Sequence, residues 1–192
     1  STSPPGDEPP DSYTYDPKDP APTYGGNTLI IPQGVANQVS VEDREDVLVY
    51  STELLTRDTE VTGPIMVHLF AASSAVDTDF TAKLVDVRPD GYAHNIQDGI
   101  IRARYRNSKS EPSLIAPGQV YEYVIDLWST SHLFKEGHRI RLDISSSNFP
   151  RFDRNPNTGT PIGQDDRMEV ANQSVHHREG FASYVVLPII PR

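Results

Sequence analysis

The sequence predicts an all-β protein, a jelly-roll β-sandwich of the galactose-binding-domain-like type. Residues 120–127 and 139–144 each place alternate side chains on opposite faces, as half-buried strands do. In the second segment we expect Arg139, Arg141 and Asp143 to face solvent. No stretch keeps a 3.6-residue apolar period over three turns, so little helix is expected. A lipocalin-like barrel is the alternative architecture.

The amino-terminal segment differs in composition from the rest of the chain. Seven of the 17 prolines lie within residues 1–22. Proline fixes φ and lacks a backbone N–H, so this segment should run extended over a surface and not join a central strand. We therefore divide the chain into a proline-rich extended arm, residues 1–26, and a jelly-roll domain, residues 27–192. Three tyrosines predict that the arm lies on an apolar surface: Tyr13, Tyr15 and Tyr24.

Apolar runs predict the strands that follow the arm. Short strands are expected at 28–31 and 47–50. A longer strand over 60–72, bent at Gly63-Pro64, carries apolar groups on both faces. That pattern is typical of a central strand covered on both sides.

The second half of the chain predicts a hairpin and several loops. Residues 79–88 and 96–104 flank Pro89-Asp90-Gly91, a turn in which proline sets the second position and glycine takes a positive φ. Residues 129–132 are expected to form a loop or a short helical turn. We expect a further loop at 151–163, a helical turn at 165–170 and a last strand at 184–190.

Composition excludes several classes of function. The 192 residues carry a net charge of −10 with no basic cluster, so nucleic-acid binding is not expected. The chain has no cysteine, which excludes disulfides, thiolate zinc sites and cysteine catalysis. No apolar run is long enough to cross a membrane and no signal peptide is recognisable. The chain begins at Ser1, without a methionine, so we expect a piece of a longer protein. We favour the cytoplasm over secretion, and a homo-oligomer stays open.

A search for catalytic motifs finds none. A hydrolase nucleophile elbow needs Gly-x-Ser-x-Gly, and the only glycines four apart, Gly159 and Gly163, enclose Pro161. The metalloprotease, phosphate-loop and dinucleotide fingerprints are also missing. We therefore predict no catalytic residue, no cofactor and no metal site, and a chain that is inactive alone.

Isolated polar residues favour structural roles. His176 and His177 would face opposite sides of an extended segment, and His68 lies in a predicted central strand. His132 and His138 flank a loop, with no carboxylate in evident register. Asp77 and Asp79 could supply two oxygen ligands to calcium. Hydrogen bonds from the backbone of a turn to these carboxylates explain the pair more simply.

Residues 145–155 form a loop rich in hydrogen-bonding side chains. A buried loop must satisfy its own backbone, so we predict a structural or interface role for five of its residues: Asn148, Phe149, Arg151, Phe152 and Asp153. Trp128, the sole tryptophan, is expected in core or interface packing. An alternative function, a free-standing carbohydrate-binding module, would require aromatic rings displayed along a groove.

Several segments closely resemble one family. Residues 13–26 (YTYDPKDPAPTYGG), 61–91 (VTGPIMVHLFAASSAVDTDFTAKLVDVRPDG) and 98–106 (DGIIRARYR) resemble the carboxy-terminal domain of CocE/NonD-type serine hydrolases. This family includes cocaine esterase, α-amino-acid ester hydrolases and X-prolyl dipeptidyl peptidases. The resemblance runs from about Tyr13 to the end of the chain.

The resemblance implies an accessory role. Such enzymes combine an α/β-hydrolase domain bearing a Ser-Asp-His triad, a helical cap, and a jelly roll packed on both. The resemblance thus implies a non-catalytic domain that stabilises its partner domains and walls part of an ester or amide pocket. It places residues 28–31 beside the acyl pocket, so Ile30 and Ile31 are the predicted substrate-facing residues, although an alternating strand would turn only one of them inward.

Overall fold

The structure is a computed structural model that describes residues 6, 8–29, 33–161, 163–164 and 166–191. Strands account for most of the regular structure within these residues. The elements in chain order are β1 (Asp11–Tyr15), α1 (Val39–Glu42), β2 (Leu48–Ser51), β3 (Thr59–Ser73), β4 (Asp79–Val87), β5 (Ala93–Arg102), the 3₁₀ helix η1 (Ala103–Tyr105), β6 (Tyr121–Phe134), β7 (Arg139–Ser145), β8 (Ala171–Arg178), β9 (Phe181–Ala182) and β10 (Tyr184–Val186).

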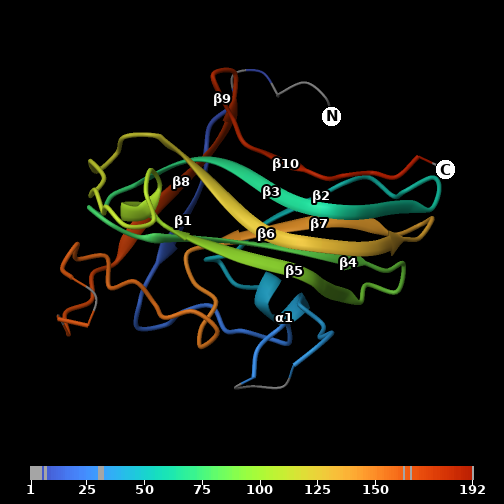
Figure 1. The fold of residues 1–192 in the computed structure, drawn as a ribbon, viewed down its shortest axis with the longest axis horizontal. Coiled ribbons are helices and arrows are strands. Elements are labelled where there is room, and N and C mark those ends of the chain that lie inside the picture. The colour runs from blue at the N-terminus through green and yellow to red at the C-terminus, as the bar shows by residue number, and fades with distance from the viewer. Residues whose placement is uncertain (1–5, 7, 30–32, 162, 165, 192) are drawn as a thin grey trace.

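The strands pair in the pattern of a jelly roll. β1 pairs with β8, β2 with β7, β3 with β6 and β4 with β5, all antiparallel. One sheet contains β1, β8, β3 and β6, with β10 also on β3 and β9 on β8, while the other has the order β2-β7-β4-β5 (Figure 1). The chain therefore folds as a long antiparallel ribbon wound into two sheets, and the predicted jelly-roll β-sandwich is confirmed.

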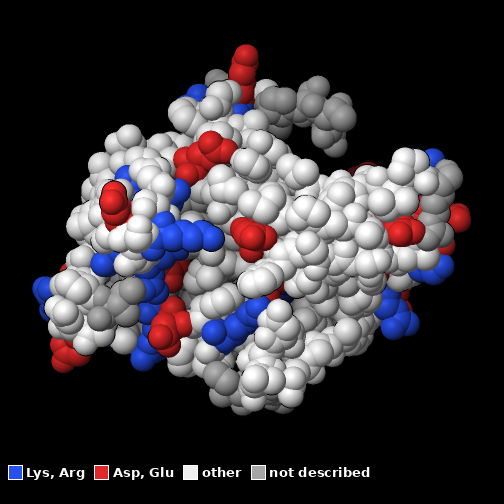
Figure 2. Space-filling model, viewed as in Figure 1, with Lys and Arg blue, Asp and Glu red and all other residues white. Residues whose placement is uncertain are grey.

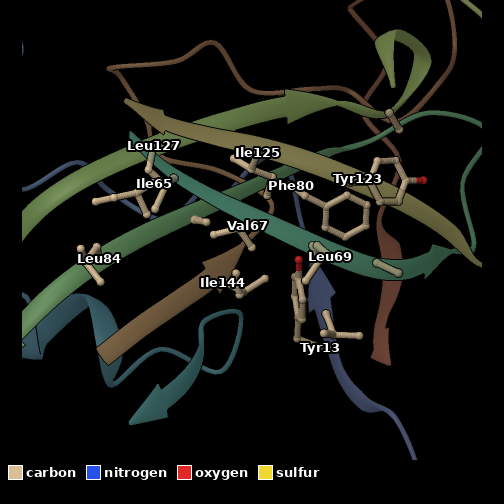
Figure 3. Packing of buried hydrophobic residues seen from close by; sticks show 14 of the residues in the cluster. Tyr13, Ile65, Val67, Leu69, Phe80, Leu84, Tyr123, Ile125, Leu127 and Ile144 are labelled. Atoms are coloured by element: carbon tan, nitrogen blue, oxygen red, sulfur yellow. The ribbon is translucent and has the colours of Figure 1, made fainter. Parts of the chain in front are cut away.

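The inward faces of the two sheets meet in one core. Leu69 on β3, Phe80 on β4 and Ile125 on β6 are fully buried, and the ring of Phe80 lies 4.7 Å from that of Tyr123, centroid to centroid. Figure 3 shows these side chains gathered between the strands that carry them. Burial of each large apolar side chain contributes about 1.5–3 kcal/mol. The alternation visible in the sequence therefore builds this core.

Strand β6 extends further than the sequence predicted. The expected loop or helical turn at 129–132 is wrong, because this segment pairs as strand with residues 61–64 of β3. The register shifts between Pro64 and Met66, and Trp128 on the partner strand takes a φ of 65°. Backbone hydrogen bonds across a bulge, and not side-chain alternation, extend β6 past this point.

The predicted hairpin at 79–104 is present with altered bounds. β4 and β5 pair across the turn at 88–92, where Gly91 has a φ of 85°. Strand β5 ends at Arg102, and the next residues form η1. One later expectation is wrong: residues 166–170, the described part of the expected helical turn, contain no helix. The last strand begins at Tyr184 as predicted but ends at Val186, four residues early.

The two sheets differ in how their outer faces are covered. β3 was expected to be covered on both sides, but its outward residues Met66, His68 and Phe70 are only half-buried, so the cover on this face is partial. The second sheet is covered instead: α1 and its flanking loops lie against β4 and β5 (Figure 1), and β4 is buried along its whole length. Asp143 on β7, predicted to face solvent, is consequently 5% exposed.

The amino-terminal arm contributes a strand to the sandwich. β1 lies at the edge of its sheet, where it pairs with β8, and its Tyr13 and Tyr15 are buried in the core. Prolines on either side of this strand are compatible with an edge position. No helix among the described residues is both long and apolar enough to cross a membrane.

Charged side chains are unevenly distributed over the face seen in Figure 1. Lys, Arg, Asp and Glu gather on the left of this view and again along its right edge, and the area between, to the right of the centre, carries few of them (Figure 2). The core of the sandwich is also open to the surface at one place. There a mainly aliphatic hollow of about 350 Å³ lies between the sheets beside β2 and β10.

Candidate functional site

The loop between the arm and α1 forms a small hairpin, here called the Gly26–Gly34 hairpin. The backbone N–H of Gly26 donates to the carbonyl oxygen of Gly34 at 2.7 Å, and the reverse bond measures 3.0 Å. Gly25, with a φ of 68°, has no space for a side chain, because a Cβ would lie 2.4 Å from the Gly34 carbonyl oxygen. The Gly25-Gly26 pair is therefore needed for both conformation and close approach.

Apolar side chains of this loop face solvent. Leu29 is 92% exposed and Val35 is 65% exposed. Val35 lines an open hollow of about 610 Å³, whose other walls come from the base of the hairpin and from β5. Exposed aliphatic groups next to a hollow are typical of a surface that another molecule covers.

Gln38 fixes the base of the loop from inside the protein. Its side chain is fully buried, and its Nε2 donates to the carbonyl oxygens of Tyr24 and Ala36, both at 3.0 Å. Its Oε1 accepts a hydrogen bond of 2.6 Å from Nζ of Lys83 on β4. A single buried amide thus ties both ends of the loop to the sheet.

A buried pair of ionisable groups lies beneath this anchor. Lys83 on β4 and Asp143 on β7 are directly opposite in the antiparallel register, and both are less than a tenth exposed. Burial lowers the pKa of Lys83, an effect that nearby Asp143 opposes. Burial raises the pKa of Asp143 to about 7, with Glu42 adding to the rise and Lys83 reducing it. No described residue donates a hydrogen bond to the Asp143 carboxyl group.

The loop at 145–155 supports the segment that leads into the hairpin. The N–H of Thr23 donates to the carbonyl oxygen of Phe149 at 2.7 Å, and the N–H of Phe149 donates to that of Ala21 at 2.9 Å. The N–H of Arg151 donates to the Thr23 hydroxyl at 3.2 Å. These bonds satisfy the backbone of both segments.

Side chains of the same loop converge on Asp98 of β5. Asn148 donates to one carboxylate oxygen at 2.8 Å, and Arg151 pairs with the other at 3.1 Å. Arg151 also lies over the ring of Phe152, 5.1 Å from its centroid. Asp153 is exposed. This loop therefore contacts the strand that forms one wall of the hollow.

The two predicted sets of residues differ in what the structure says of them. Ile30 and Ile31 lie outside the described residues. Of the loop residues, Asn148 contacts Asp98 of β5, and Arg151 contacts both Asp98 and Thr23, in the segment that leads into the hairpin. Sequence reasoning missed the anchor, because nothing marks Gln38, Lys83 and Asp98 as neighbours in the sequence; only the Gly25-Gly26 pair signals a special backbone.

Two interpretations of polar residues need correction. Asp77 was expected to bond the turn backbone, and it does accept from the N–H of Arg104 at 2.9 Å, but it also binds the Arg104 guanidinium at 2.8 Å. Asp79 pairs in the same way with Arg102, again at 2.8 Å. The pair therefore neutralises two arginines from the region of β5 and η1, because the hairpin register places them opposite each other.

The second correction concerns histidines. His132 and His138 were expected to have no carboxylate in register, yet both lie within hydrogen-bond distance of Asp86, at 2.8 and 2.7 Å. The other predicted histidines do occupy structural positions: His68 pairs with Glu122 and stacks on Tyr184.

The described residues contain no arrangement typical of a serine nucleophile. Ser174 Oγ lies 3.4 Å from Nε2 of His176, but the two residues share one strand. The Nδ1 atom of His176 has no hydrogen-bond partner among the described residues, so no carboxylate orients the ring. A catalytic triad needs that third group.

Comparisons with known proteins agree on one relationship. Residues 1–186 match the model of the X-Pro dipeptidyl-peptidase C-terminal non-catalytic domain. The chain is 51% identical over 196 aligned residues to cocaine esterase of Rhodococcus sp. (strain MB1 Bresler), covering 100% of this chain and 34% of that protein.

Solved structures show the same relationship. An aminopeptidase from a marine sediment archaeon, Thaumarchaeota archaeon, matches with a TM-score of 0.89 and 31% identity, over 98% of this chain and 34% of that one. An α-amino acid ester hydrolase matches with a TM-score of 0.89 and 31% identity, over 99% and 34%. The chain thus spans about a third of the length of these relatives.

Proposed function

Because the chain belongs to the family of X-Pro dipeptidyl-peptidase C-terminal non-catalytic domains of CocE/NonD-type hydrolases, we propose that it docks on an α/β-hydrolase catalytic domain and a helical cap of the same polypeptide. There it walls part of the pocket in which an ester or amide is cleaved. The serine nucleophile, the histidine base and the oxyanion hole come from the catalytic domain.

One observation carries this proposal: the Gly26–Gly34 hairpin displays apolar side chains from a rigid base. Leu29 is 92% exposed. A partner domain that covers this side chain would remove its apolar surface from water, which is favourable. Gln38 and the glycine pair fix the base of the hairpin. A preorganised loop loses little conformational entropy when it is covered.

The substrate class follows from the relatives and not from the fold. Those named above are an esterase, an ester hydrolase and an aminopeptidase. We propose that the whole protein hydrolyses acyl esters or peptide-like amides. The exposed aliphatic side chains of Leu29 and Val35 suit the acyl part of such a substrate, because they offer dispersion contacts.

The alternative, a carbohydrate-binding module, gains no support from the positions of the aromatic rings. Five aromatic rings of the described residues are buried: Tyr13, Tyr15, Phe80, Tyr123 and Phe134. Tyr24, Trp128 and Tyr184 are exposed. Trp128 and Tyr184 lie on β6 and β10, which pair with opposite sides of β3, and Tyr24 lies outside both strands. Calorimetry with oligosaccharides is expected to show no binding.

A charge placed in the hairpin tests the pocket wall. In the full-length polypeptide, Leu29→Asp is expected to reduce kcat/KM for p-nitrophenyl esters of apolar acids by about tenfold or more, mainly through KM. The matched control is Leu54→Asp, which places the same charge at another exposed leucine, 53% exposed, outside the hairpin. Equal losses in both variants, or no loss in Leu29→Asp, would refute the proposed role of the hairpin.

A further inference from the structure

Three histidines surround one buried carboxylate at the end of the sandwich where the β4–β5 and β6–β7 turns lie, on the right in Figure 1. Asp86 on β4 is 1% exposed. Its Oδ2 atom lies 2.8 Å from Nε2 of His132 on β6 and 3.9 Å from Nε2 of His94 on β5. Its Oδ1 atom lies 2.7 Å from Nδ1 of His138, next to β7. Three consecutive strands, β4, β5 and β6, and the turn before β7 therefore contribute to one cluster.

The fold explains why these side chains converge. Asp86 and His94 are directly opposite in the β4–β5 register, so their side chains lie on the same face of the hairpin. His132 comes from the end of β6 that pairs with Val61 on β3. The ring of His132 packs edge-on against Phe134 at 4.7 Å and against His94 at 5.4 Å, centroid to centroid. These contacts orient the two rings before any ligand arrives.

The donor atoms have the chemistry of a transition-metal site. One Asp86 oxygen and one ring nitrogen each of His94 and His132 all lie within 4.8 Å of one another. Zinc binds imidazole nitrogen and carboxylate oxygen at about 2.0–2.2 Å. Side-chain rotations that move the donor atoms by about an ångström would therefore place all three around one ion. Calcium and magnesium prefer sites made of oxygen only.

We propose that Asp86, His94 and His132 bind a first-row divalent transition metal such as Zn²⁺, with His138 as a positioning residue. His138 contacts Oδ1 of Asp86, the carboxylate oxygen that does not face His94 and His132. Groups that hydrogen-bond to a metal-binding carboxylate in this way hold it in the orientation that the metal requires. His94, His132 and His138 retain 18%, 24% and 17% of their side-chain exposure, so an ion can enter from solvent. Three protein ligands leave a fourth position for water.

Isothermal titration of the chelator-treated chain with ZnCl₂ tests this site. We expect one saturable site per chain, and at least about tenfold weaker binding in His94→Gln and in Asp86→Asn. The matched control is His68→Gln, because His68 faces a lone carboxylate, Glu122, at 2.7 Å. This variant is expected to bind zinc as the parent does.

A second measurement needs no variant to fold. Addition of Zn²⁺ to the unsubstituted chain is expected to shift the ring NMR signals of His94 and His132 together, and those of His68 much less. No saturable binding would overturn the proposal. So would binding that persists unchanged in both His94→Gln and Asp86→Asn, or ring shifts that favour His68.

Discussion

Asp143 offers a test of how the candidate site is built, because its carboxyl group is buried beneath the loop anchor without a hydrogen-bond donor among the described residues. We consider its replacement by asparagine, which keeps the shape and removes the ionisation. The structure predicts that the effect of Asp143→Asn on stability depends strongly on pH.

The sign of this dependence follows from the pKa values. Burial raises the pKa of Asp143 in the folded state to about 7, from a value of 3.8. As pH rises past about 4 the unfolded chain loses this proton while the folded chain keeps it. The free energy of unfolding of the parent therefore falls relative to the variant until about pH 7. At about 1.4 kcal/mol per pH unit, this interval gives up to about 4 kcal/mol.

The assay is urea unfolding of both proteins, followed by circular dichroism, between about pH 4 and about pH 8. Near pH 4 the two should be similarly stable, and near pH 8 Asp143→Asn should be the more stable by a few kcal/mol. The control Asp153→Asn removes an exposed carboxylate and should show no such trend. A constant difference between parent and Asp143→Asn, or one of opposite slope, would show that the buried pair is wrongly described.

Three further substitutions probe the fold. Arg104→Met leaves the buried carboxylate of Asp77 without its guanidinium and should cost about 3–5 kcal/mol in chemical unfolding; a loss below about 1 kcal/mol would contradict the pairing. Leu69→Ala should cost about 2–5 kcal/mol, whereas the exposed Leu29→Ala should change stability by about 0.5 kcal/mol or less; equal effects would argue against the core. Gly25→Ala forces a Cβ to within 2.4 Å of a carbonyl oxygen at a positive φ, so its midpoint of thermal unfolding should fall, and an unchanged midpoint would disprove the tight hairpin.

Strands whose side chains alternate could be predicted from the sequence, and strands held mainly by backbone bonds could not. The first half of β6 shows a period of two because one of its faces is buried. β7 alternates in the sequence as well, although Asp143 on its polar face is buried. Residues 129–132 of β6 are polar on both faces, and they form strand because residues 61–64 of β3 pair with them.

The candidate site shows the same division. The Gly25-Gly26 pair and the polar loop at 145–155 are visible in the sequence, since special backbones need glycine and buried loops need hydrogen-bonding side chains. The Lys83–Asp143 pair and the histidines around Asp86 arise from the register between strands far apart in the chain. Register follows from turn geometry and core packing together, and neither is local to those residues.

Hydrolysis of a p-nitrophenyl ester by the purified 192-residue chain tests most directly whether this domain carries a reaction centre of its own. The structure predicts no turnover above that of buffer, because no serine among the described residues has a histidine base oriented by a carboxylate. Saturable turnover that a serine-directed inhibitor abolishes would contradict the account.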